Sequence, residues 1–201
     1  MSMTNERPIP RSVCVYCASS RSSHEEYREA AFRLGSVLAE QGLEIVYGGG
    51  GAGSMGALAD GALARGGRVV GVLPRFMADL EWGHPGLSEL QLVEDMRTRK
   101  HLMLSRSEAA IALPGGSGTL EELLEAITLK RLGLYLKPIV LVNTRGFFDP
   151  LAGFFRHIVA ERFMDERHLE MWQLVAHPEE VPAALESAPH WSASARSFAA
   201  L

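Results

Sequence analysis

Short apolar runs alternate with longer amphipathic stretches along most of the chain. Runs rich in β-branched, aromatic or small apolar residues predict strands. Stretches with apolar residues three and four positions apart predict helices between them. The predicted strands cover about residues 12–17, 43–47, 68–73, 90–93, 109–112, 137–143 and 171–176. The predicted helices cover about residues 24–41, 53–65, 96–107, 149–164 and 178–187, with a further helical pattern over 123–132 and an irregular loop over 74–87.

Six or seven strands that alternate with helices predict a single Rossmann-like α/β domain, with a doubly wound, mainly parallel sheet flanked by helices. The chain of 201 residues is long enough for one such domain with a sizeable core. We expect the domain to cover residues 12–187, after a flexible arm (1–11) and before a tail (188–201) that is either frayed or a partner-binding arm. Ligands of such sheets bind at the carboxyl ends of the strands.

A glycine-rich turn follows the predicted strand at 109–112 and precedes a helix. Glycines at positions 115, 116 and 118 let the backbone come close to a ligand. The N-terminus of the following helix presents unpaired N–H groups and a positive dipole end, so we expect a phosphate to bind on residues 115–119. Glu122 would then lie beside the anion, where a carboxylate suits chemistry at the sugar of a nucleotide. Alternatively, Thr119 and Glu122 form a capping box with a purely structural role.

A second glycine loop follows the strand at 43–47. Its Gly48, Gly50 and Gly53 fit the G-x-G-x-x-G pattern of dinucleotide sites. The next strand ends without an acidic residue for a ribose, and the loop lacks the Gly-Lys-Ser/Thr ending of a P-loop. We therefore expect this loop, including Gly49, Gly50 and Gly53, to approach a smaller nucleotide. Ser19 and Ser20, at the end of the first strand, are either ligand-binding hydroxyls or helix caps.

The helix at 96–107 carries Met96, Met103 and Leu104 on a stripe that is typical of a core-facing surface. Arg99 and Lys100 would ordinarily form a solvated face. Near a phosphate-binding turn, their positive charges become candidates for ligand binding.

Charge and composition exclude several classes of function. The chain has 20 Lys and Arg against 24 Asp and Glu, a net charge of −4, and no basic run suited to nucleic acid or an anionic membrane. No signal peptide or membrane-spanning stretch is found, so a cytoplasmic location is expected. The seven His residues show no metal-ligand spacing, and no metal is predicted. Cys14 and Cys17 lie on a predicted strand with sulfurs on opposite faces, as expected for buried, inert thiols.

Three segments together resemble the LOG proteins, which are cytokinin riboside 5′-monophosphate phosphoribohydrolases long mislabelled as lysine decarboxylases. Residues 114–122 (PGGSGTLEE) match the family's P-G-G-x-G-T-x-x-E signature. Residues 96–103 (MRTRKHLM) resemble its M-H-x-R-K-x-x-M helix, with Arg97 in place of the usual His. Residues 48–56 (GGGGAGSMG) resemble its first glycine loop, with Ser54 where Leu is common. The likeness extends over about residues 12–180.

The resemblance implies that Arg99 and Glu122 are the catalytic pair. It also implies substrate contacts, beyond the Gly115 already expected in the phosphate turn, from these residues: Glu81, Lys100, Gly116, Ser117, Gly118, Thr119, Leu120, Glu121 and Thr128. The implied reaction is hydrolysis of a nucleoside 5′-monophosphate, with no cofactor, by a homodimer. A non-catalytic nucleotide or molybdenum-cofactor carrier is the alternative, because related proteins of this fold include such carriers.

The decarboxylase label does not fit the chemistry of the chain. A pyridoxal enzyme needs a Schiff-base lysine and a partner for the pyridinium nitrogen. The only lysines are Lys100, Lys130 and Lys137, and none lies in such a pattern.

Overall fold

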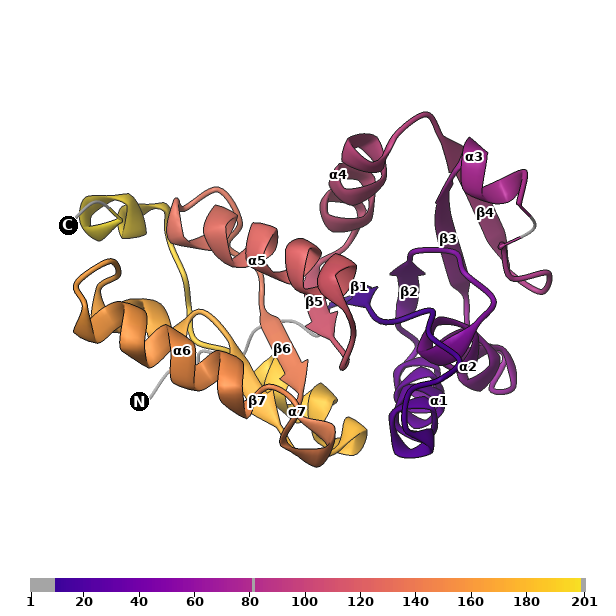
Figure 1. Cartoon of the computed structure of the whole chain (residues 1–201), viewed down its shortest axis with the longest axis horizontal. Helices are drawn as coiled ribbons and strands as arrows, with labels where there is room; N and C mark the ends of the chain where they lie inside the picture. Colours follow the sequence, from indigo (N-terminus) through magenta and orange to yellow (C-terminus); the bar gives the residue numbers. More distant parts are fainter. Residues whose placement is uncertain (1–9, 81, 200–201) are drawn as a thin grey trace, which may run out of the picture.

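A parallel sheet of seven strands forms the centre of the computed structural model, which describes residues 10–80 and 82–199 (Figure 1). The strands are β1 (Ser12–Tyr16), β2 (Glu44–Tyr47), β3 (Val69–Pro74), β4 (Glu89–Val93), β5 (Ala109–Ala112), β6 (Ile139–Val142) and β7 (Gln173–Val175). Their order across the sheet is β4-β3-β2-β1-β5-β6-β7. Glu81 and residues 1–9 of the predicted arm lie outside the described residues.

The helices follow the strands in alternation, as the sequence predicted. The α-helices are α1 (Glu25–Glu40), α2 (Gly53–Leu63), α3 (Arg75–Ala78), α4 (Met96–Arg106), α5 (Ser117–Arg131), α6 (Asp149–Ala160) and α7 (Val181–Glu186). The 3-10 turns are η1 (Thr144–Gly146), η2 (Glu166–Glu170), η3 (Pro178–Glu180) and η4 (Ala193–Phe198). Within the described residues, no helix is long and apolar enough to cross a membrane.

Helices cover both faces of the central strands, whereas the edge strand β4 leaves Leu90 and Leu92 exposed. In β1, Cys14 and Tyr16 pack into one apolar cluster with residues of α4, α5 and α6. Val13 and Val15, on the opposite face, pack with residues of α1, α2 and α7. This alternation with a period of two is the pattern of a strand buried on both sides. The predicted doubly wound α/β fold is confirmed.

The structure also confirms that the two cysteines diverge. Cys14 belongs to the cluster under α4 and α5, whereas Cys17 belongs to the cluster on the other face. Both thiols are free and buried.

Three predicted boundaries are wrong, each for a local reason. The loop predicted at 74–87 contains the single helical turn α3. The helix predicted to reach Met164 ends at Ala160, because Arg162 adopts a left-handed backbone with φ of 64°. A residue in this conformation commonly ends a helix, but it is usually glycine, so an arginine at this position carries no stop signal. The helix predicted at 178–187 divides into η3 and α7, which has a proline in its first turn.

The segment after residue 187 packs against the C-terminal end of α5. The indole Nε1 of Trp191 donates a hydrogen bond to the carbonyl of Lys130 over 2.8 Å. The guanidinium of Arg196 donates to the carbonyl of Leu132 over 3.1 Å. The division of the chain into arm, domain and tail stays a prediction.

The chain reverses its direction of travel across the sheet between β1 and β5. Strands β1 to β4 extend to one edge, and β5 then returns to pair with β1 on its other side. The loops after β1 and β5 therefore diverge toward opposite faces and leave a crevice at the carboxyl ends of these strands.

Candidate functional site

A cavity of about 260 Å³ lies at this crevice. It is lined by the segment after β1, the start of α5, and side chains from α2 and α4. The lining residues are Cys17, Ala18, Ser19, Ser20, Met55, Met96, Arg99, Gly116, Ser117, Gly118, Thr119, Glu121 and Glu122. The predicted phosphate turn and the predicted catalytic pair therefore share one cavity.

The N-terminus of α5 opens into this cavity without a side-chain cap. Gly116 is the N-cap residue and makes no capping hydrogen bond. Gly116, Ser117 and Gly118 are exposed. The first N–H groups of a helix have no partner within the helix, and the dipole adds partial positive charge there. This end of α5 has the chemistry that binds a phosphate.

Gly115 is needed for the tight approach of the turn to α5. A Cβ at this position would lie 2.2 Å from the hydroxyl oxygen of Thr119. Thr119 itself is buried. Any side chain at residue 115 would push the turn away from the helix.

The capping box that the sequence left open is absent. Because α5 begins at Ser117, Thr119 is its third residue and Glu122 its sixth. A capping box needs the hydroxyl at the N-cap and the carboxylate three residues later. The carboxylate of Glu122 instead lies 3.3 Å from a guanidinium nitrogen of Arg99, which comes from α4.

Arg99 is buried and fully engaged, so it does not form the solvated face that is ordinary for an arginine on a helix. Its side chain is only 6% exposed, and that of Glu122 is 7% exposed. The Nε of Arg99 donates to the carbonyl of Val72 over 3.0 Å, and Nη2 donates to the carbonyl of Gly48 over 3.1 Å. Nη1 faces Glu122 and lies 4.0 Å from the sulfur of Met96. A buried charge needs such partners, and together they fix the plane of the guanidinium.

Burial and charge act in opposite directions on Glu122. Desolvation raises the pKa of this carboxyl, and the neighbouring Arg99 guanidinium partly offsets the rise. The pair places an ionisable carboxylate with a raised pKa at the wall of a cavity, a combination that is frequent at active sites.

The thiol of Cys17 lies in the same cavity but is a poor nucleophile. Burial raises its pKa, and the negative charge of Glu122 raises it further. The thiolate is the reactive form of cysteine, so Cys17 contributes a neutral surface.

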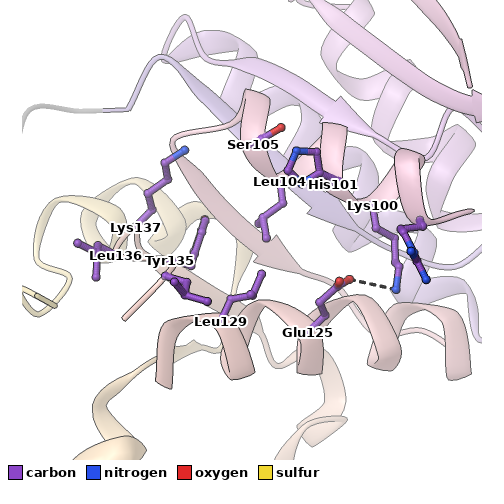
Figure 2. A pocket seen from close by; sticks show the side chains of 11 residues that line it. Lys100, His101, Leu104, Ser105, Glu125, Leu129, Tyr135, Leu136 and Lys137 are labelled. Carbon is purple, nitrogen blue, oxygen red and sulfur yellow. Dashed lines mark ion pairs between the residues drawn. The ribbon is translucent and has the colours of Figure 1, made fainter. Parts of the chain in front are cut away.

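Lys100 is held away from this cavity by two carboxylates of α5. It forms an ion pair with Glu121 and another with Glu125 at 3.1 Å. Figure 2 shows the second pair, at one end of a larger pocket of about 680 Å³ between α4, α5 and residues 134–137. Lys100 lines that pocket, together with apolar residues such as Leu104 and Leu129.

Other predicted site residues lie outside the smaller cavity. Thr128 is exposed on α5, and Leu120 packs against the core. Glu81 falls outside the described residues. The roles of these residues in substrate binding stay predictions.

The glycines of the first glycine loop lie beside the cavity and do not line it, although Met55 of the same segment does. Gly49 has φ of 78° and packs against β3, and Gly50 forms an isolated bridge with Gly83. Gly53 starts α2 against the backbone of Ser19 and Ser20, where a Cβ would come within 2.5 Å.

Sequence reasoning missed four lining residues, namely Cys17, Ala18, Met55 and Met96. Met96 lies three residues before Arg99, a spacing that places both on one face of α4. Cys17 directly follows β1 at the carboxyl edge of the sheet. These positions in the sequence could have indicated that the residues lie at the site, but their apolar character suggested core packing. In the described part of the chain, no group of three or more His, Cys, Asp or Glu side chains could hold a metal ion.

Residues 55–185 match a family model described as possible lysine decarboxylase. The chain is similar to a cytokinin riboside 5′-monophosphate phosphoribohydrolase of Rhodococcoides fascians, with 45% identity over 159 residues, 79% of this chain and 80% of that protein. It is also similar to the Arabidopsis thaliana cytokinin riboside 5′-monophosphate phosphoribohydrolase LOG1, with 40% identity over 159 residues, 78% of this chain and 75% of that protein.

Among solved structures, the chain is similar to the molybdenum cofactor carrier protein of Chlamydomonas reinhardtii. The TM-score is 0.68 at 22% identity, and the match covers 88% of this chain and 96% of the other. A likeness at this level of identity shows a shared fold alone.

Proposed function

The chain belongs to the LOG family of phosphoribohydrolases, and we propose that it hydrolyses the N-glycosidic bond of a nucleoside 5′-monophosphate. The products are the free base and ribose 5-phosphate. The substrate class is a cytokinin riboside 5′-monophosphate, AMP or both. The observation that carries the proposal is the buried Arg99–Glu122 pair, which faces a cavity beside the uncapped N-terminus of α5.

The two ends of the substrate fit two parts of the cavity. The 5′-phosphate would bind on residues 115–119, where backbone N–H groups and the helix dipole favour an anion. Glu122 lies about one turn further along α5, where its carboxylate would face the ribose.

Cleavage of an N-glycosidic bond develops positive, oxocarbenium-like charge on the ribose. The C1′–N bond breaks, and a water molecule supplies a hydroxyl to C1′ and a proton to the departing base. The carboxylate of Glu122 would stabilise the positive charge and orient the water. Arg99 would keep this carboxylate ionised and in place, because its charge opposes the rise in the pKa of Glu122.

The amines of the chain do not fit the decarboxylase description of the family. Lys100 is paired with Glu121 and Glu125. Lys130 donates to the carbonyl of Lys137, and Lys137 to that of Ser107. None of the three lines the cavity of the Arg99–Glu122 pair, so no lysine there could hold a pyridoxal Schiff base.

A carrier that binds a nucleotide or a molybdenum cofactor without turnover is the second candidate, favoured only by the shared fold. The full chain is incubated with AMP, an N6-substituted AMP and adenosine, and free base is measured by chromatography. Base from a monophosphate, with much less from adenosine, supports the proposal. If neither monophosphate releases base, the enzyme proposal is wrong.

The finer predictions extend this proposal. We propose a homodimer in the cytoplasm that acts on a small-molecule nucleotide. Contacts from Glu81, Lys100 and Thr128 to the substrate are part of the same proposal.

A further inference from the structure

The first glycine loop matches a nucleotide-binding pattern, yet its glycines do not line the cavity beside it. Its first member, Gly48, contacts Arg99 instead. The carbonyl oxygen of Gly48 accepts a hydrogen bond of 3.1 Å from Nη2 of Arg99. This contact joins residues 51 positions apart in the chain.

The absence of a side chain at residue 48 is as important as its carbonyl. A Cβ built on Gly48 would lie 1.8 Å from Nη2 of Arg99 and 3.0 Å from its Cζ. Real Cβ atoms do not approach other heavy atoms to 1.8 Å, so the guanidinium occupies the space of the missing side chain. The backbone of Gly48 does not have the positive φ that favours glycine, unlike that of Gly49. Alanine at residue 48 would therefore be excluded by Arg99 and not by backbone strain.

The two carbonyls that hold Arg99 lie within a strand of the sheet or directly after one. Gly48 directly follows β2, and Val72 lies within β3, which pairs with β2. With Nε and Nη2 fixed on these carbonyls, only Nη1 is left to face Glu122. The sheet thus sets the position of the guanidinium, and the guanidinium sets the position of the carboxylate.

We propose that Gly48 is a positioning residue for Arg99, so that the first glycine loop serves to seat the guanidinium beside Glu122 and not to bind a nucleotide. The effect on turnover rests on the proposed function. The effect on the Arg99–Glu122 contact does not, and it can be measured without turnover.

The test is Gly48→Ala, with Gly50→Ala as the matched control. A Cβ on Gly48 would also approach Cε of Met55 at 3.1 Å, and a Cβ on Gly50 would approach the sulfur of the same side chain at 2.7 Å. Gly50→Ala therefore displaces Met55 without a contact to Arg99. We expect kcat to fall by about 10²-fold in Gly48→Ala, as for a catalytic group misplaced by about 1 Å. Gly50→Ala is expected to lose clearly less activity than Gly48→Ala, because it moves the cavity-lining Met55 but leaves Arg99 in place.

A double-mutant cycle separates positioning from a general structural effect. In an Arg99→Ala background the clash disappears, so Gly48→Ala should add no further loss. If Gly48→Ala alone fails to fold, recovery of folding in the double variant supports the same clash. Parent-like kcat in Gly48→Ala, or an equal further loss in the Arg99→Ala background, would overturn the proposal.

A second readout is the titration of the Glu122 carboxyl, followed by NMR in the folded variants. Displacing Arg99 removes the positive charge that lowers the pKa of Glu122. The midpoint should therefore move to higher pH in Gly48→Ala, remain unmoved in Gly50→Ala, and show no added effect of Gly48→Ala in the Arg99→Ala background. If the parent is inactive but these shifts occur, the proposed function fails and the positioning role stands. If the parent is active and no shift occurs, the positioning role fails alone.

Discussion

The substitution Glu122→Gln removes the negative charge of the carboxylate while keeping its shape and an oxygen that can accept from Arg99. Two unit charges about 4 Å apart interact by about 4 kcal/mol at an effective dielectric constant of about 20. The side chain of Glu122 is only 7% exposed, so water screens it little, but Arg99 at 3.3 Å neutralises part of its field. We therefore expect a loss of about 3–4 kcal/mol of transition-state stabilisation. Since each 1.4 kcal/mol of transition-state stabilisation corresponds to a tenfold change in rate, kcat should fall by about 10²- to 10³-fold.

The affinity for the nucleotide should change little in Glu122→Gln, because the phosphate is expected to bind on the N-terminus of α5. The assay measures kcat by base release and nucleotide affinity by titration, with thermal melts to verify folding. Glu125→Gln is the matched control, since it removes the same charge from an exposed position of the same helix outside the cavity. A kcat within about threefold of the parent, with a lowered melting temperature, would refute the catalytic role of Glu122.

Two further predictions follow from the same pair of residues. Arg99→Lys should keep the positive charge yet recover little of the activity that is lost in Arg99→Ala. A single ammonium group cannot reach Val72, Gly48 and Glu122 together, as the planar guanidinium does. Steady-state kinetics that show near-parent kcat and KM in Arg99→Lys would contradict this. Because burial raises the pKa of Glu122 and the reaction needs its carboxylate, kcat/KM should fall as the pH falls through a midpoint above the ordinary Glu value of about 4.3. Arg99→Ala should move this midpoint to higher pH. The test compares the pH profiles of kcat/KM for the parent and the variant on the same nucleotide, so that the ionisation of the substrate affects both profiles equally. An unmoved midpoint would show that Arg99 does not act on Glu122.

The sequence predicted the central strands well because both of their faces are buried. Runs such as residues 109–112 and 137–143 have no polar face, and in the structure β5 and β6 are covered on both sides. The glycine turn before α5 was also predictable, since glycines at residues 115, 116 and 118 before a helix indicate a turn in which the backbone needs the freedom of glycine.

The environment of Arg99 was not predictable from local patterns. An arginine on a predicted helix is ordinarily solvated, and nothing near residue 99 indicates that it is buried. Its partners Gly48, Val72 and Glu122 lie 51, 27 and 23 positions away. These residues meet Arg99 because the fold brings the carboxyl ends of β2 and β3 and the start of α5 together at one end of the parallel strands.

The start of α5 shows the opposite difficulty, a local pattern with two interpretations. Thr119 and Glu122 have the spacing of a capping box, and only the position of the helix start decides between cap and site. The helix begins two residues before Thr119, at Ser117, so Glu122 falls in its second turn and faces Arg99.

The most direct test of the central claim is to measure both products of a single nucleotide in one reaction. The full chain is incubated with AMP or an N6-substituted AMP, and free base and ribose 5-phosphate are quantified together. We expect the two products in equal amounts over many turnovers, with no requirement for added phosphate or pyridoxal cofactor. Tight binding of the nucleotide that yields neither product would show that the Arg99–Glu122 cavity holds its ligand without cleaving it, and would contradict the account.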